Sequence, residues 1–290
     1  MGRKSAKRHL AEGTRSDRGG ARRSRFYLAI AGVVVVVAAV VSGAWLFAVH
    51  TGGRQEPSHR AAIVDQLSAR IPNASFVDSA TSMLEQAGYS VDYYDADKVT
   101  VDFFRDLPTH DYDLIILRAH SAIPRKDLSL PSDVPQDVLD KIMVQIGDDV
   151  LLFTSQPYDS TAYLDDQKAL RLFPVVYTGD SMANAYFAVS SFFVKSSMRG
   201  RFNGTTIILM GCSSLASDKT AAALVDKGAK GVVGWSDMVS PEHTDQATAQ
   251  LLQHLLKDKL PLAKAVDMTN SEVGQDPTYG SSMRAYPPNG

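Results

Sequence analysis

Two short runs of aliphatic residues constrain the fold of this 290-residue chain most strongly. Residues 114–117 read Leu-Ile-Ile-Leu and residues 207–210 read Ile-Ile-Leu-Met. This continuous apolar pattern is typical of strands that are buried on both faces, as the central strands of parallel sheets are. The first run leads to His120 and the second to Cys212, the single cysteine of the chain. Ligands of open α/β sheets bind beyond the carboxyl ends of the strands, so the sequence predicts a histidine and a thiol at that edge.

Strand and helix patterns alternate around these two runs. Strand patterns cover residues 61–67, 89–94 and 231–235. Helical spacing or helix caps mark residues 75–87, 101–107, 217–227 and 240–259. This alternation predicts βαβ units and an α/β fold with a mainly parallel sheet. We also expect residues 147–155 to be extended and residues 260–266 to form a short helix, whereas residues 271–290 read as a C-terminal coil.

His120 and Cys212 form a candidate catalytic dyad. If their strands are neighbours, the backbones lie about 4.8 Å apart and both side chains emerge at one edge of the sheet. A histidine beside a cysteine can take its proton, and the thiolate is the nucleophile. The alternative is that Cys212 is a small buried hydrophobe, as free cysteines often are, and that His120 is a hydrogen-bonded loop residue.

These two blocks resemble the caspase/gingipain/separase superfamily of cysteine peptidases, which includes caspase-like and CHAT-like domains. One block runs into a histidine and a small residue, and the other runs through a small residue into a cysteine. Residues 221–235 also resemble the helix, turn, strand and tryptophan that follow the cysteine in caspase-like domains. The similarity spans about residues 61–266. It implies a three-layer sandwich in which helices flank a mainly parallel central sheet.

The resemblance also implies roles for individual residues. His120 would be the general base and Cys212 the nucleophile, with the oxyanion held by the backbone at Ser121, at Gly211 and at Cys212 itself. The family usually has glycine where Ser121 stands and alanine where Gly211 stands. Because both replacements are small, the geometry of the site could survive them. The chemistry needs no metal and no cofactor.

Three further residues are candidates for binding substrate. Asp237 lies two residues beyond Trp235, the last residue of a predicted strand, and Asp180 lies in a polar loop. A carboxylate at this edge could bind a basic side chain of the substrate, or it could hydrogen-bond only its own loop. His243 and Asp245 could be drawn as a metal site with the dyad histidine. Two residues apart on a helix, however, they point in different directions, so we expect no metal.

Residues 26–49 form an uncharged run of 24 residues. A helix of this length reaches about 36 Å, which is enough to cross a hydrocarbon core of about 30 Å. A cleaved signal peptide is the alternative, although its apolar region is only about 7–15 residues long. Residues 1–25 carry nine Lys or Arg against two acidic residues. This charge places the N-terminus in the cytoplasm, and a nucleic-acid-binding tail is the competing interpretation.

The expected organisation follows from these segments. It comprises a basic cytoplasmic tail (1–25), a transmembrane helix (26–49), a linker (50–60), a caspase-like domain (61–270) and the C-terminal coil (271–290). The net charge of the whole chain is −2, although residues 1–25 contribute +7. The remainder is therefore acidic, and nucleic acid is not an expected partner. Expected partners are a protein or peptide substrate and, through the N-terminal helix, the cell membrane.

The sequence therefore predicts a single-pass membrane protein with an extracytoplasmic cysteine endopeptidase domain. The alternative is a catalytically inactive caspase-like module that binds a peptide or envelope partner as a scaffold, which the departures at Ser121 and Gly211 motivate. A non-peptidase hydrolase or transferase that uses the same dyad is a third interpretation.

Overall fold

The structure is a computed structural model that describes residues 59–124, 143–177 and 179–288. The predicted basic tail and transmembrane helix lie outside these residues, as does the linker up to residue 58. None of the helices in the described ranges combines the length and the apolar character that a bilayer span requires.

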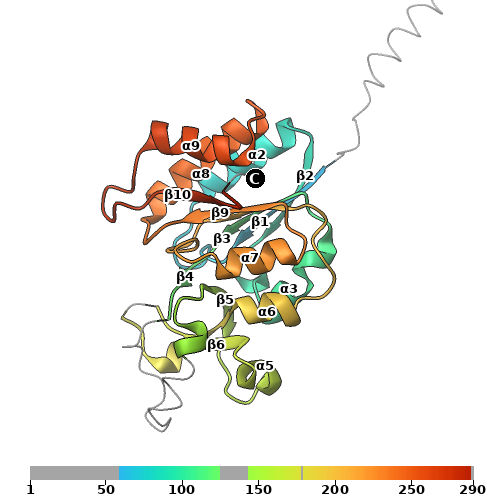
Figure 1. The fold of residues 1–290 in the computed structure, drawn as a ribbon, viewed down its shortest axis with the longest axis vertical. Coiled ribbons are helices and arrows are strands. Elements are labelled where there is room, and N and C mark those ends of the chain that lie inside the picture. The colour runs from blue at the N-terminus through green and yellow to red at the C-terminus, as the bar shows by residue number, and fades with distance from the viewer. Residues whose placement is uncertain (1–58, 125–142, 178, 289–290) are drawn as a thin grey trace, which may run out of the picture. The chain divides into compact units, whose positions relative to one another are not determined.

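The core of the domain is a six-stranded sheet with the order β10-β9-β8-β3-β1-β2 (Figure 1). Its strands are β1 (His59–Asp65), β2 (Tyr89–Tyr94), β3 (Leu114–Arg118), β8 (Thr206–Leu209), β9 (Gly231–Trp235) and β10 (Met283–Tyr286). All neighbouring pairs are parallel except β9 and β10. The two aliphatic runs supply β3 and β8, which are buried along almost their whole length. The predicted α/β fold with a mainly parallel sheet is confirmed.

Helices cover both faces of this sheet (Figure 1). One face packs against α2 (Ala74–Gln86), α8 (Pro241–Leu256) and α9 (Leu262–Val273). The other face packs against α3 (Val101–Asp106), α6 (Ser191–Ser196) and α7 (Lys219–Asp226). Successive strand residues alternate between the two apolar layers, because side chains along a strand point to opposite faces. Ile116 and Ile208 belong to the first layer, for example, and Leu117 to the second.

A second, smaller sheet follows the histidine block. It is antiparallel with the order β4-β5-β7-β6. Its strands are β4 (Ser121–Ala122), β5 (Leu151–Pro157), β6 (Leu172–Val175) and β7 (Tyr186–Val189). The short helix α5 (Leu164–Lys168) lies between β5 and β6 in the chain. Residues 147–155 are extended only from Leu151 onward. The rest of this sheet has strands of two to four residues, which are too short to show a hydrophobic period in the sequence.

Local capping signals explain several helix ends. The side chain of Asn73 accepts a 3.1 Å hydrogen bond from the N–H of Phe76 at the start of α2, and Gly88 follows that helix with φ of 89°. Pro241 is the first residue of α8, where its missing N–H costs nothing. Short 3-10 turns occur at Ala96–Lys98, Leu107–His110 and Met182–Asn184.

The prediction of a coil over residues 271–290 is wrong in two respects. α9 continues to Val273, and Met283–Tyr286 form β10 at the edge of the main sheet beside β9. Met283 is buried whereas Arg284 is exposed. The four-residue strand stands among serine, glycine and proline residues that favour turns, and its pairing with β9 overrides that local preference.

Candidate active site

His120 and Cys212 lie at equivalent places beyond two adjacent parallel strands. Leu117 of β3 pairs with Leu209 of β8, and each site residue stands three positions further along its strand. The N–H of Met210 continues the ladder with a 2.9 Å hydrogen bond to the carbonyl of Leu117. The condition of the dyad hypothesis, that the two strands are neighbours, is thereby met.

His120 stands where the chain passes from the main sheet to the second sheet. Its N–H donates to Oε1 of Gln66 at 3.1 Å, and its carbonyl accepts from the N–H of Phe153 in β5 at 3.0 Å. The imidazole meets the ring of Tyr177 in an edge-on contact with centroids 4.7 Å apart, and the ring of Phe153 at 5.9 Å. Backbone bonds on one side and aromatic rings on the other therefore position this histidine.

The surroundings of His120 favour the neutral imidazole. Burial lowers its pKa to about 4, and the positive charges of Arg70 and Arg118 act in the same direction. At neutral pH the ring is therefore unprotonated, and a pKa this far below neutrality also makes it a weak base. The same environment opposes a resting ion pair between an imidazolium and a thiolate.

Cys212 occupies the first turn after β8 and is partly buried. Its Sγ lies 3.5 Å from the carbonyl oxygen of Val239, in the loop before α8. Within the described residues the imidazole of His120 makes no hydrogen bond to this sulfur. The N–H of Cys212 likewise has no acceptor there, whereas the next N–H, of Ser213, is bonded to the carbonyl of Asp237 at 2.8 Å. The backbone thus offers one free donor beside the thiol.

Ser121 and Gly211 fit each other across the two loops. The hydroxyl of Ser121 donates to the carbonyl of Cys212. A Cβ at position 211 would overlap Oγ of Ser121 and would stand 2.5 Å from the carbonyl oxygen of Ala119. The side chain of Ser121 therefore occupies space that Gly211 leaves free.

The candidate substrate carboxylates have different partners. The side chain of Asp237 is exposed and accepts a 2.8 Å hydrogen bond from the N–H of Met238, within its own loop. Asp180 forms a 2.8 Å ion pair with Arg70. That arginine in turn lies over the ring of Tyr177, which contacts the histidine of the dyad.

Trp235 lies in the core below the site. It is 1 % exposed, and its Nε1 donates to Oγ1 of Thr244 in α8 at 2.9 Å. In this conformation the indole offers no surface to a substrate. His243 packs against Trp235 with ring centroids 5.4 Å apart. The described ranges hold no group of three metal-ligating side chains.

A buried charge cluster beneath the site was missed by sequence reasoning. Arg118, the last residue of β3, is 1 % exposed and pairs with Asp245 through two hydrogen bonds of 2.8 and 3.1 Å. It also donates to Asp65 at 2.9 Å, and Asn73 donates to Asp245 at 2.8 Å. Burial raises the pKa of Asp65. The sequence shows only that Arg118 directly follows the aliphatic run 114–117. This does not reveal which residues pair with it.

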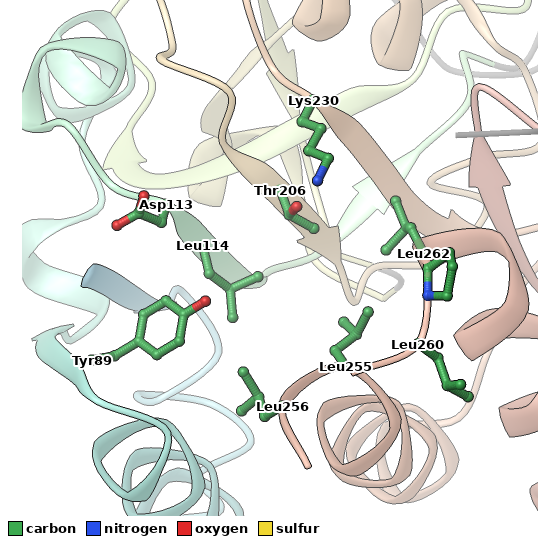
Figure 2. A pocket seen from close by; sticks show the side chains of 10 residues that line it. Tyr89, Asp113, Leu114, Thr206, Lys230, Leu255, Leu256, Leu260 and Leu262 are labelled. Carbon is green, nitrogen blue, oxygen red and sulfur yellow. The ribbon is translucent and has the colours of Figure 1, made fainter. Parts of the chain in front are cut away.

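A pocket of about 280 Å³ opens at the opposite edge of the main sheet (Figure 2). Leu114 and Thr206, the first residues of β3 and β8, line it together with Lys230. Leucine side chains from α8, α9 and the segment between them form its other wall (Figure 2). This pocket lies at the amino ends of the strands, so it is separate from the edge that holds the dyad.

The chain matches no known family model and no curated protein.

Proposed function

We propose that this chain is a cysteine peptidase in which His120 and Cys212 hydrolyse peptide bonds. The supporting observation is the register of β3 and β8, which brings the two residues to equivalent positions beyond the carboxyl ends of adjacent parallel strands. This edge is the usual place for chemistry in an open α/β sheet. The N–H of Cys212, which has no acceptor among the residues that the structure describes, adds a donor of the type that stabilises an oxyanion.

The reaction proceeds by acyl transfer. Neutral His120 takes the proton of the Cys212 thiol, and the thiolate attacks the carbonyl carbon of the peptide. The oxyanion that forms lies against the N–H of Cys212 and the backbone at Ser121 and Gly211. The imidazolium then protonates the leaving amine as the C–N bond breaks. Water, deprotonated by the same imidazole, hydrolyses the thioester and releases the acid.

The thiol must turn before this reaction starts. Its present contact is the carbonyl of Val239 at 3.5 Å, and rotation about its single side-chain bond redirects Sγ. Because the pKa of His120 is about 4, the base is unprotonated across the neutral range. Proton transfer then accompanies substrate binding, and the resting enzyme holds a neutral thiol and a neutral imidazole.

The finer architecture and the location belong to the same proposal. We assign the domain to a caspase-like three-layer sandwich, held outside the cytoplasm by a membrane anchor at residues 26–49. The helices on both faces of the main sheet support the first assignment, and the uncharged run after a basic tail supports the second. Fractionation tests the anchor: the full chain should sediment with membranes after a carbonate wash, whereas residues 57–290 should remain in the supernatant.

A scaffold without catalytic activity is the second candidate. The observation that favours it is the direction of Sγ, which contacts a backbone carbonyl and has no hydrogen bond to the imidazole among the described residues. Such a module would bind a peptide or envelope partner at this edge and leave it intact.

Hydrolysis of a peptide library by the full chain in detergent micelles separates the two candidates. We expect Cys212→Ala to abolish turnover and His120→Ala to lower it by at least about 10²-fold, the usual contribution of a general base. His110→Ala is the matched control, because this partly buried histidine packs against Tyr112 and precedes the amino end of β3, whereas the dyad lies beyond the carboxyl ends of the strands. Turnover that survives in Cys212→Ala would refute the dyad. No turnover, together with slow alkylation of the thiol by iodoacetamide, would favour the scaffold.

A further inference from the structure

An arginine of the chain itself is bound beside His120. The guanidinium of Arg70 lies 3.8 Å from the ring centroid of Tyr177 and 5.8 Å from that of Tyr186. It also forms a 2.8 Å ion pair with Asp180. Arg70 belongs to the turn after β1, whereas Tyr177 and Asp180 lie in the loop between β6 and β7 and Tyr186 begins β7. We call these partners, Tyr177, Tyr186 and Asp180, the arginine box.

The arginine box adjoins the base of the dyad. One side of the Tyr177 ring carries the guanidinium, and the same ring makes the 4.7 Å edge-on contact with the imidazole of His120. Buried Gln66 connects the same two residues, because it donates to the Tyr177 hydroxyl at 2.6 Å and accepts from the N–H of His120. A cation in the box therefore lies one aromatic ring away from the proposed base.

We propose that the arginine box is a subsite for a basic side chain of the peptide substrate, and that Arg70 occupies it when no substrate is bound. The proposal deepens the proposed function and rests on it, since it takes the dyad as the place where the peptide is cut. A substrate arginine or lysine displaces Arg70 and makes the same contacts. Arg70 thereby acts as an internal competitor.

The chemistry of the box fits this ligand class. Two tyrosine rings supply π faces that attract a cation, and a carboxylate supplies the opposite charge. The side chain of Arg70 is 40 % exposed, so it can leave the box without disruption of the core. Its departure leaves the ion-pair position at Asp180 and the face of Tyr177 open to solvent.

A second arginine provides the matched control. Arg60 lies 4.8 Å from the ring centroid of Tyr112 and pairs with Asp92 at 2.8 Å, the same chemistry as in the box. Arg60 stands at the start of β1, whereas Arg70 follows the carboxyl end of that strand. Removal of either arginine therefore exposes a tyrosine and an aspartate, and only one of these sets adjoins His120.

Calorimetric binding of Nα-acetyl-arginine amide to the full chain, in a Cys212→Ala background that prevents turnover, tests the proposal. We expect Arg70→Ala to tighten binding at least about tenfold, because a site that its internal occupant fills nine-tenths of the time loses that factor in apparent affinity. The gain should vanish when Asp180→Asn is added, and Arg60→Ala should bind as the parent does. The uncharged citrulline analogue should not bind tightly to any variant.

Several results would overturn the proposal. They are equal affinities of the parent and Arg70→Ala, a gain that persists with Asp180→Asn, or an equal gain in Arg60→Ala. Arg70→Gln keeps a polar side chain of similar length and replaces Arg70→Ala if that variant does not fold. The readout is independent of turnover. A binding gain in Arg70→Ala together with no hydrolysis by the wild-type chain would therefore refute the peptidase alone. Hydrolysis with no preference for basic residues and no binding gain would refute the box alone.

Discussion

The hydroxyl of Ser121 donates a 2.6 Å hydrogen bond to the backbone carbonyl of Cys212. This bond joins β4, which begins directly after His120, to the turn that follows β8 and contains Cys212. The bond depends on the missing side chain at the neighbouring position, since a Cβ on Gly211 would overlap the same hydroxyl.

Gly211→Ala should therefore destabilise the domain by about 1–3 kcal/mol, the usual cost of added volume in a packed site. Urea unfolding measures the effect. Ser121→Gly in the same chain removes one of the two overlaps and leaves that with the Ala119 carbonyl. The double variant should thus recover part of the loss, with an interaction energy above about 0.5 kcal/mol. Strict additivity would contradict the steric account.

Gln66 should position the base. Gln66→Leu has a similar volume but removes the acceptor for the His120 N–H and the donor to Tyr177. We expect a fall in kcat of about tenfold, in line with the loss of a supporting hydrogen bond of about 1–1.5 kcal/mol. Gln66→Glu keeps the acceptor and should retain more of kcat than Gln66→Leu. Equal losses in both variants would show that the acceptor does not hold the histidine.

Acid should destabilise the fold through His120. Its pKa is 6.5 in the unfolded chain and about 4 in the folded domain, so between these values the unfolded state binds the extra proton. The contribution is fully present above pH 6.5 and is lost as the pH falls through 4, and its ceiling is about 3 kcal/mol. Between pH 7 and 4, the wild type should lose about 3 kcal/mol more unfolding free energy than His120→Gln. Parallel pH profiles would show that the histidine is not desolvated.

Arg118→Met should be among the most damaging substitutions, because it leaves Asp65 and Asp245 buried without their counter-charge. Removal of one partner from a buried ion pair costs about 3–5 kcal/mol. Arg199→Met is the control, since the ion pair of Arg199 with Asp106 is exposed, and it should change stability by less than about 1 kcal/mol. Equal effects in chemical denaturation would contradict the burial argument.

The parts of the fold with long, regular patterns could be predicted from the sequence. The strands Tyr89–Tyr94 and Gly231–Trp235 have the expected bounds, and α2 and α3 begin and end within one residue of them. In each case local periodicity and tertiary packing favour the same structure, as they do for the two central strands. The adjacency of β3 and β8 was a condition of the dyad hypothesis, and the pairing of the two strands meets that condition.

Apart from β5, which the expected extended segment at residues 147–155 covers in part, the second sheet and β10 could not be predicted, because their short strands gain their hydrogen bonds from partners distant in sequence. The same limit applies to the site. A cysteine and a histidine after apolar strands can be recognised in the sequence. Gln66 and Tyr177 contact His120, and Arg70 contacts Tyr177, only because the fold brings them together. Long-range contacts of this kind leave no local pattern.

The change of sheet at His120 has a mechanical consequence. The carbonyl of His120 accepts a hydrogen bond from Phe153 in β5 of the second sheet, whereas Cys212 lies in the turn after β8 of the main sheet. The histidine is also held to the main sheet, because its N–H is bonded to Gln66 after β1 and the next residue, Ser121, is bonded to the carbonyl of Cys212. The proposed base is therefore anchored to both sheets, so a substitution in β5 of the second sheet can alter its position relative to the thiol.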